Sequence, residues 1–245
     1  MLGIIRGDIR YEALAKMLNA KISNELYDFL EIDALLLPFG GIDEAYNIKQ
    51  SKLNLLDILK ENEIKTIFVG NANNKLKELC EQKNIALIEL LKLDEFIIPN
   101  AKLTSMGIVN YLSSGNLSVK DQNICIIGLG NIGFSLAELL KAYECSFSVF
   151  PGSTIEEKFI KLQGYPLADF KNSEIIINTI PKNLDWDYTL FKNKRIIDVA
   201  SAPYGFDIDK INSLGIRYEI VSAIPSKFAY ISAAKIMKNI IEKYL

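Results

Sequence analysis

Short apolar runs alternate with stretches of helical spacing along the whole chain. In its first half, buried strands are predicted at residues 2–5, 34–37, 66–69 and 86–89, with helices at 11–18, 53–59 and 75–82. The second half repeats the pattern, with strands expected at 123–127, 147–150, 174–178, 195–199 and 217–221 and helices at 132–143, 155–162 and 228–244. Such alternation favours parallel sheets that helices cover on both faces.

Two such sets predict an α/β protein of two lobes. We expect an N-terminal α/β domain, flavodoxin-like or Rossmann-like, over residues 1–102 and a C-terminal Rossmann domain over residues 116–225. A helix-like stretch at 103–112 starts after Pro99 and runs into Ser113-Ser114-Gly115-Asn116, so residues 103–115 are predicted to form a linker helix. The last segment, 226–245, is amphipathic and is a candidate to pack back on the N-terminal domain.

The composition excludes several kinds of active site. None of the 245 residues is a histidine, which excludes imidazole-ligated zinc, Ser-His-Asp and Cys-His nucleophiles, and dehydrogenases that use imidazole as a proton carrier. A formal net charge of −2 gives no support to a nucleic-acid partner. The acidic residues form no cluster with metal-ligand spacing, so no metal is expected. The 3 cysteines lie in separate apolar runs and are predicted to be core residues.

The chain carries no targeting or membrane signal that we can identify. Its apolar start runs directly into Arg6 and Asp8, which is not the pattern of a signal peptide. No apolar stretch approaches the roughly 18 uninterrupted residues of a membrane span. A cytoplasmic protein without a membrane partner is therefore expected.

The strongest motif is a glycine turn between a predicted strand and a predicted helix. The sequence Gly128-Leu129-Gly130-Asn131-Ile132-Gly133 fits the dinucleotide-binding pattern G-x-G-x-x-G. The first glycine permits the tight turn, the second lets the backbone approach a pyrophosphate, and the third lets the helix lie close to the strand. The N–H groups at the helix start then face the phosphates. Dinucleotide binding is favoured over a merely tight turn, because a strand, a helix and a second strand flank the motif.

The end of the second strand of this unit is expected to select the cofactor. An acidic residue there would bind the ribose 2′-hydroxyl, but the chain reads Phe150-Pro151-Gly152-Ser153-Thr154. We expect Gly152, Ser153 and Thr154 to contact the cofactor, with Ser153 and Thr154 as donors to a 2′-phosphate and Lys158 within reach. The sequence thus favours NADP(H), with NAD(H) as the alternative.

Further candidates lie at the carboxyl ends of predicted strands, where open α/β sheets bind ligands. Asn178, Thr179 and Pro181 follow one strand and are predicted to contact the cofactor. The segment Asp198-Val199-Ala200-Ser201-Ala202-Pro203 follows another. In the first lobe, Gly7-Asp8-Ile9-Arg10 follows the first strand, where Asp8 is equally a helix cap.

Taken together, these motifs resemble those of the family of the dipicolinate synthase A subunit. The shared positions are Gly7-Asp8-Ile9-Arg10, Leu37-Pro38, the segment 94–100 with Thr104 and Gly107, the glycine turn, Ile177-Asn178-Thr179-Ile180-Pro181, the segment 198–203 with Gly205 and Asp207, and Ile224-Pro225. The resemblance implies an NADP-dependent dehydrogenase subunit that converts a hydroxy-tetrahydrodipicolinate to dipicolinate for bacterial endospores, in the mother cell. The partner that it implies is the flavoprotein-like B subunit; a homo-oligomer is left open.

The resemblance suggests candidate substrate residues as well as departures. Arg10, Thr104 and Ser201 are the candidates to bind a small cyclic dicarboxylate, with Asp8 orienting Arg10 or acting as a base. Met106 and Ile231 stand where the family is expected to have a Glu and a Lys. A catalytically impaired nucleotide-binding subunit that supports a partner protein, or a dehydrogenase for another small acid, are therefore the alternatives.

Overall fold

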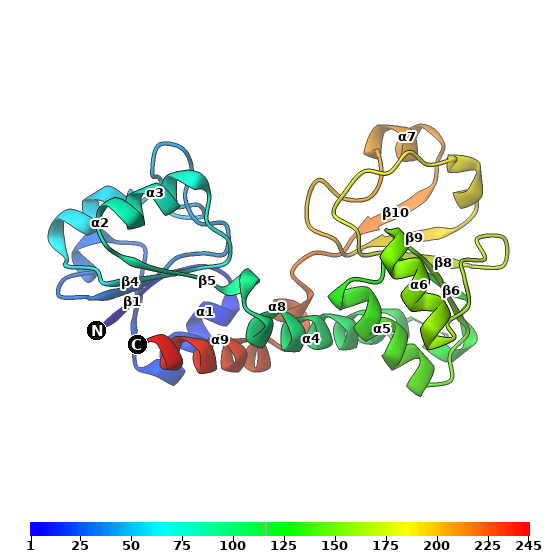
Figure 1. Ribbon diagram of the computed structural model, residues 1–245, viewed down its shortest axis with the longest axis horizontal. Helices are drawn as coiled ribbons and strands as arrows, with labels where there is room; N and C mark the ends of the chain where they lie inside the picture. Colours follow the sequence, from blue (N-terminus) through cyan, green and yellow to red (C-terminus); the bar gives the residue numbers. More distant parts are fainter. Residues whose placement is uncertain (116) are drawn as a thin grey trace. The chain divides into compact units, whose positions relative to one another are not determined.

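The structure is a computed structural model that describes residues 1–115 and 117–245. It divides into two compact units, Met1–Asn100 with Ala229–Leu245 (unit 1) and Ala101–Phe228 (unit 2) (Figure 1). Each unit contains one parallel five-stranded sheet, as the alternating pattern predicts. Residue 116, where the sequence places the start of the Rossmann domain, lies outside the described residues.

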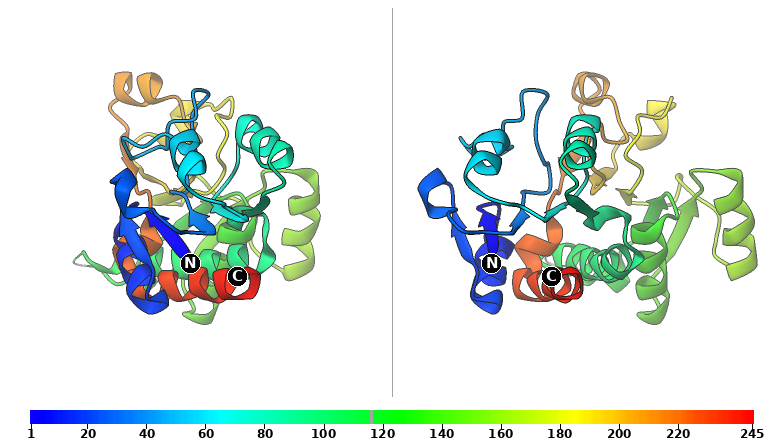
Figure 2. Two further views of the ribbon diagram at one scale, coloured as in Figure 1. Left: turned by 90° about the vertical axis from the view of Figure 1, so that its left-hand side faces the viewer. Right: turned by 60° about the vertical axis from the view of Figure 1, so that its left-hand side comes forward.

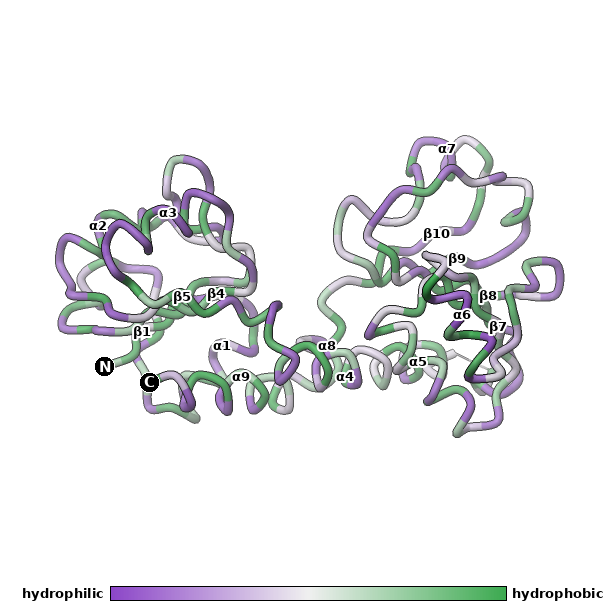
Figure 3. The backbone as a smooth tube through the Cα atoms, viewed as in Figure 1, coloured by the Kyte–Doolittle hydropathy of each residue, from purple (hydrophilic) through white to green (hydrophobic). Residues whose placement is uncertain are grey.

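Unit 1 is a parallel sheet of order β2-β1-β3-β4-β5. Its strands are β1 (Leu2–Ile5), β2 (Lys21–Ser23), β3 (Ala34–Leu36), β4 (Thr66–Val69) and β5 (Ala86–Glu89). The helices α2 (Leu55–Glu61) and α3 (Asn74–Gln82) cover one face, and α1 (Ile9–Leu18) and α9 (Tyr230–Tyr244) cover the other (Figure 1). Successive residues of a strand point to opposite faces, so Ile4 and Leu36 enter one core while Ile5 and Leu35 enter the other. The hydropathy of the chain is shown in Figure 3.

The C-terminal helix belongs to unit 1. Helix α9 lies beside α1 (Figure 2), and its buried side chains include Ala234, Met237 and Ile241. These share a cluster with Ile4 of β1 and Leu14 of α1. The last helix thus completes a core that begins at the N-terminus.

Unit 2 is a parallel sheet of order β10-β9-β8-β6-β7. Its strands are β6 (Ile124–Ile127), β7 (Phe147–Phe150), β8 (Ile175–Asn178), β9 (Arg195–Asp198) and β10 (Arg217–Ile220). Residues of α5 (Asn131–Ala142), α6 (Thr154–Gln163) and the second half of α4 (Asp94–Ser113) pack on one face, and α7 (Ile208–Ser213) packs on the other. The short helix α8 (Ile224–Phe228) ends the unit.

The linker helix is longer than the sequence predicts. We expected it to begin after Pro99, but α4 runs from Asp94 to Ser113 with Pro99 inside it. Proline at this position removes only the hydrogen bond to the carbonyl of Glu95, close to the helix start. Phe96 is 1% exposed and packs in the core of unit 1, which favours the earlier helix start. Local propensity is here outweighed by burial.

Among the strands and α-helices of the described residues, β2, α7 and α8 were not predicted. Strand β2 is three residues long and pairs only with β1 at the sheet edge, while α7 and α8 span six and five residues. Each is too short to produce a periodic pattern of apolar residues.

Candidate functional site

The glycine turn of unit 2 joins β6 to α5 and has the features of a phosphate-binding turn. Gly128 has a φ of +89°, a left-handed conformation that favours glycine. A Cβ on Gly133 would lie 2.1 Å from the carbonyl oxygen of Gly128, so only glycine lets α5 approach the strand this closely. In contrast, a Cβ on Gly130 would meet no atom within 4 Å. Packing therefore does not require glycine at 130, and the space above it is open to a ligand.

The first turn of α5 also leaves donors available. Gly130 is the N-cap of this twelve-residue helix, and no side chain caps it. The N–H groups of Asn131, Ile132 and Gly133 begin the helix and have no carbonyl acceptor within it. Such a helix start, next to a glycine without a Cβ, suits the pyrophosphate of a dinucleotide. The residues present fit the cofactor that the motif predicts.

Two side chains hold the turn in place. The Thr179 hydroxyl donates to the carbonyl oxygens of Ile127 (2.9 Å) and Gly128 (3.4 Å). From the other side, the carboxylate of Glu156 accepts the N–H of Leu129 at 2.8 Å. Thr179 was predicted to contact the cofactor, but its hydroxyl bonds point to a supporting role for the loop.

Glu156 was missed by the sequence analysis and removes the premise on which NADP(H) was favoured. The sequence has no acidic residue directly after β7, but Glu156 Oε2 accepts the N–H of Gly152 at 2.7 Å, so a carboxylate does lie at this strand end. Ser153 caps α6 by accepting the N–H of Glu156 at 3.2 Å. The pattern Ser153-x-x-Glu156 is that of a capping box, which was the available signal. Thr154, at the start of α6, is exposed.

Asp198 lies in a segment that the sequence analysis named, but no role was predicted for this residue. This carboxylate, at the end of β9, is 0% exposed. Its Oδ1 accepts from Asn178 Nδ2 and Ala200 N, both at 3.0 Å, and its Oδ2 accepts from Gly205 N at 3.0 Å and Tyr218 Oη at 2.9 Å. Burial and the adjacent carboxylate raise the pKa of Tyr218, which keeps its hydroxyl a donor. Asp198 thus fixes the turn that carries Ser201.

The other predicted residues of unit 2 differ in accessibility. Asn178 is buried, and besides Asp198 it bonds both the N–H and the carbonyl of Ile180, so its amide organises the strand end. Pro181 and Ser201 are exposed. Thr104 lies in α4 and is 5% exposed.

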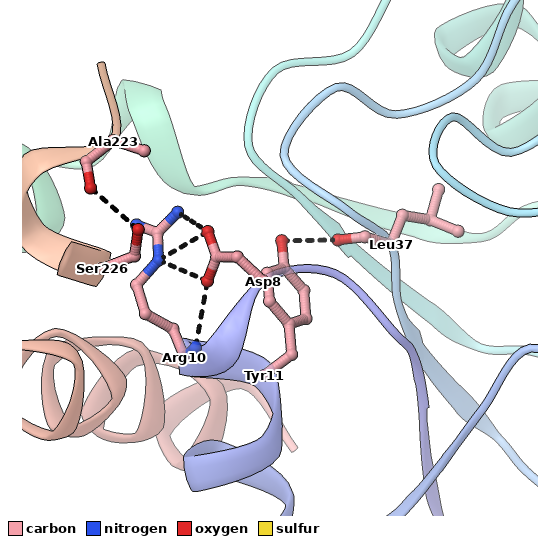
Figure 4. Close-up of polar contacts among 6 residues, drawn as sticks. All are labelled: Asp8, Arg10, Tyr11, Leu37, Ala223 and Ser226. Carbon is pink, nitrogen blue, oxygen red and sulfur yellow. Dashed lines mark hydrogen bonds and ion pairs between the residues drawn. The ribbon is translucent and has the colours of Figure 1, made fainter. Parts of the chain in front are cut away.

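In unit 1 the structure brings Asp8 and Arg10 together (Figure 4). Asp8 caps α1 by accepting the N–H of Arg10 at 3.0 Å, and its carboxylate also binds Arg10 Nε (2.9 Å) and Nη2 (2.5 Å). The guanidinium lies 4.6 Å from the centre of the Phe39 ring. Asp8 therefore caps the helix and forms an ion pair at the same time. It orients the guanidinium of Arg10 through Nε and Nη2, and its carboxylate makes no hydrogen bond to Nη1. In unit 2, Ser226 Oγ donates to the carbonyl of Ala223 at 2.8 Å (Figure 4).

Within the described ranges, no group of three or more acidic or cysteine residues could hold a metal ion. The helices of these ranges are all too short or too polar to cross a membrane.

Comparison with known proteins identifies both sequence and fold relatives. No protein-family model matches the chain. The A subunit of dipicolinate synthase from Bacillus subtilis is 24% identical over 236 residues, which cover 89% of this chain and 79% of that protein.

Solved structures show that the fold is shared as well. The dipicolinate synthase A subunit from Bacillus halodurans has a TM-score of 0.81 and 23% identity, covering 99% of this chain and 96% of that one. D-Lactate dehydrogenase from Escherichia coli has a TM-score of 0.61 and 11% identity, covering 99% and 95%. In sequence and in fold, the chain is thus a divergent relative of the dipicolinate synthase A subunit, as its motifs predict.

Proposed function

We propose that the chain is a nicotinamide-dinucleotide-dependent oxidoreductase related to the dehydrogenase subunit of dipicolinate synthase. One observation carries the proposal: the glycine turn leaves open space at Gly130 beside the uncapped start of α5. The fold shared with D-lactate dehydrogenase and the similarity to a dipicolinate synthase subunit support a redox role. When bound, the nicotinamide supplies the hydride acceptor or donor.

In this proposal the chain's own residues bind and orient. Gly128 to Gly133 and the first N–H groups of α5 hold the pyrophosphate, while Thr179 keeps the turn in shape. Gly152, Ser153 and Thr154, after β7, flank the adenosine ribose. Pro181 borders the cofactor beyond the end of β8, where the buried Asn178 holds the strand end in place.

The proposed substrate is a small cyclic dicarboxylate, a hydroxy-tetrahydrodipicolinate. A guanidinium held by a carboxylate is a preorganised binder for a second carboxylate, which favours Arg10 as a substrate contact with Asp8 as its positioning residue. Thr104 and Ser201 remain the proposed further polar contacts. Loss of water and of two hydrogens would produce the aromatic dicarboxylate, whose stability drives the reaction.

A second candidate is a nucleotide-binding subunit without its own activity, which supports the B subunit of such an enzyme. Met106 and Ile231, which stand in for the expected Glu and Lys, are each 48% exposed. Exposed apolar side chains cannot replace a carboxylate or an ammonium in proton transfer or in binding a carboxylate.

Product formation distinguishes the candidates. The chain is mixed with the hydroxy-tetrahydrodipicolinate and the dinucleotide, with and without the B subunit, and the ultraviolet absorbance of dipicolinate is followed. We expect product with the wild type, and with Arg10→Ala a loss of turnover of about a hundred-fold or more with nearly unchanged dinucleotide affinity. Dinucleotide binding without any product, even with the B subunit, favours the second candidate. Equal turnover of Arg10→Ala contradicts the assigned role of Arg10.

A further inference from the structure

The end of β7 lacks an acidic residue in sequence but has a carboxylate in space. Glu156 lies in the first turn of α6, six residues after the last residue of β7. Its Oε2 accepts two backbone N–H groups, from Leu129 in the glycine turn at 2.8 Å and from Gly152 after β7 at 2.7 Å. A single oxygen therefore bridges the ends of the two strands that form the first half of the nucleotide-binding unit.

This carboxylate remains accessible for a ligand. Glu156 is half-buried, and both backbone bonds use Oε2, so that Oε1 is not involved in either of them. A Cβ on Gly152 would lie 2.7 Å from Ile180 Cδ1 and 3.3 Å from Glu156 Oε2, so glycine there leaves room for both side chains. The position of the Glu156 carboxylate is therefore fixed by the ends of β6 and β7 and by the capped start of α6.

Ser153, which the sequence analysis predicted to donate to a 2′-phosphate, has a structural role instead. Ser153 Oγ accepts the N–H of Glu156 and thereby caps α6. Two backbone N–H groups at this strand end, those of Leu129 and Gly152, already donate to Glu156. An incoming 2′-phosphate would find these donors occupied and would meet a negative charge.

We propose that Glu156 makes the site selective for NAD(H) against NADP(H). This rests on the proposed dinucleotide site. In Rossmann units, a carboxylate between the glycine turn and the end of the second strand accepts a hydrogen bond from the ribose 2′-hydroxyl. A 2′-phosphate carries about −1.5 to −2 charges and is repelled by the same group. Glu156, from a helix, thus takes the role of the acidic residue that usually follows the second strand, which is to bind the ribose 2′-hydroxyl.

The test compares binding of NADH and NADPH by titration calorimetry, a readout that does not depend on turnover. The wild type, Glu156→Gln and Glu157→Gln are measured side by side. Gln keeps the shape and an acceptor oxygen but removes the charge. Glu157 is the matched control, since it is the next residue on the same helix and pairs with Lys161 at 2.7 Å. We expect the wild type and Glu157→Gln to prefer NADH by about ten-fold or more, and Glu156→Gln to lose about ten-fold of that preference.

Each outcome has a defined meaning. Equal affinities or a preference for NADPH in the wild type, or an unchanged ratio in Glu156→Gln, overturns the inference while dinucleotide binding stands. No binding of either nucleotide overturns the proposed function itself. If Glu156→Gln does not fold, the wild type alone still decides, because adenosine 5′-monophosphate is expected to bind at least about ten-fold more tightly than adenosine 2′,5′-bisphosphate, from which it differs only by the 2′-phosphate. Equal binding of these two ligands contradicts the proposal.

Discussion

At the scale of single residues, Asp198 is a charged side chain in the buried interior of unit 2. A fully buried carboxylate accepts four hydrogen bonds, two of them from backbone N–H groups of the turn that follows β9. Such an acceptor is stable in a buried position because every oxygen is used. The carboxylate therefore acts as the fixed point for the segment that carries Ser201.

Replacing Asp198 by Asn tests this role. One amide NH2 group would then face donors that need an acceptor, so we expect the free energy of unfolding to fall by about 2–4 kcal/mol. Urea unfolding followed by the fluorescence of Trp186, which packs in the same unit, measures the loss. Asp209→Asn, at an exposed position on α7, is the control and should stay within about 0.5 kcal/mol. Coincident unfolding curves for the two variants would show that Asp198 has no such role.

Residue-scale signals explain what the sequence could and could not reveal about the site. The glycine turn could be predicted because its three glycines stand at the fixed spacing of the G-x-G-x-x-G pattern, between a predicted strand and a predicted helix. Glu156 was not predicted as a residue of the nucleotide site, because it lies in the following helix and its carboxylate contacts the strand end only in the folded chain. The role of Asp198 was not predicted, because its four hydrogen-bond donors come from β8, β10 and the turn after β9, which only the fold brings together.

At the scale of elements, an ion pair links the edge strand β10 to its neighbour β9. Glu219 of β10 binds Arg195 of β9 through Nε and Nη2, both at 2.9 Å, and accepts the Tyr111 hydroxyl of α4 at 2.6 Å. Arg195, Tyr111 and Arg217 together lower the pKa of Glu219 to about 2. The ionised form is therefore strongly favoured in the folded chain.

This lowered pKa predicts a pH-dependent contribution to stability. The folded pKa lies below that of the unfolded chain, about 4.3, so the contribution is complete above the unfolded value and is lost as the pH falls through the folded one. We expect Glu219→Gln to cost about 1–2 kcal/mol at pH 7 and progressively less between about pH 5 and pH 2. Urea unfolding of both proteins across this range measures the difference. A cost that does not change with pH would contradict the ionic origin.

The elements themselves were largely predictable, and the exceptions have physical causes. The strands β1, β6 and β8 are almost entirely apolar, which identifies them without any tertiary information. The start of α4 was placed too late because proline is a reliable stop signal only where burial does not favour the helix. Strand β2 exists because β1 offers it a partner, which no local pattern reveals.

At the scale of the whole molecule, the chain passes between its two units twice. The first passage lies within α4 and the second follows Phe228, so that α9 returns to the unit that contains the N-terminus. The candidate residues are distributed accordingly, with Asp8 and Arg10 in unit 1 and the glycine turn in unit 2. In the proposed reaction, the absence of histidine from the chain leaves the proton steps to carboxylate, substrate or water.

The central claim is that unit 2 binds a nicotinamide dinucleotide at its glycine turn, and Gly130→Ala tests it most directly. A Cβ at Gly130 or at Gly115 would meet no protein atom within 4 Å, so alanine at either should leave the fold intact, with only the small loss of stability that alanine causes at the N-cap position of Gly130. Calorimetric titration with NADH is expected to give binding to the wild type and to the control Gly115→Ala. We expect a loss of about ten-fold or more in Gly130→Ala, where the methyl group would meet the pyrophosphate. Unchanged affinity of Gly130→Ala, or no binding by the wild type, would contradict the account.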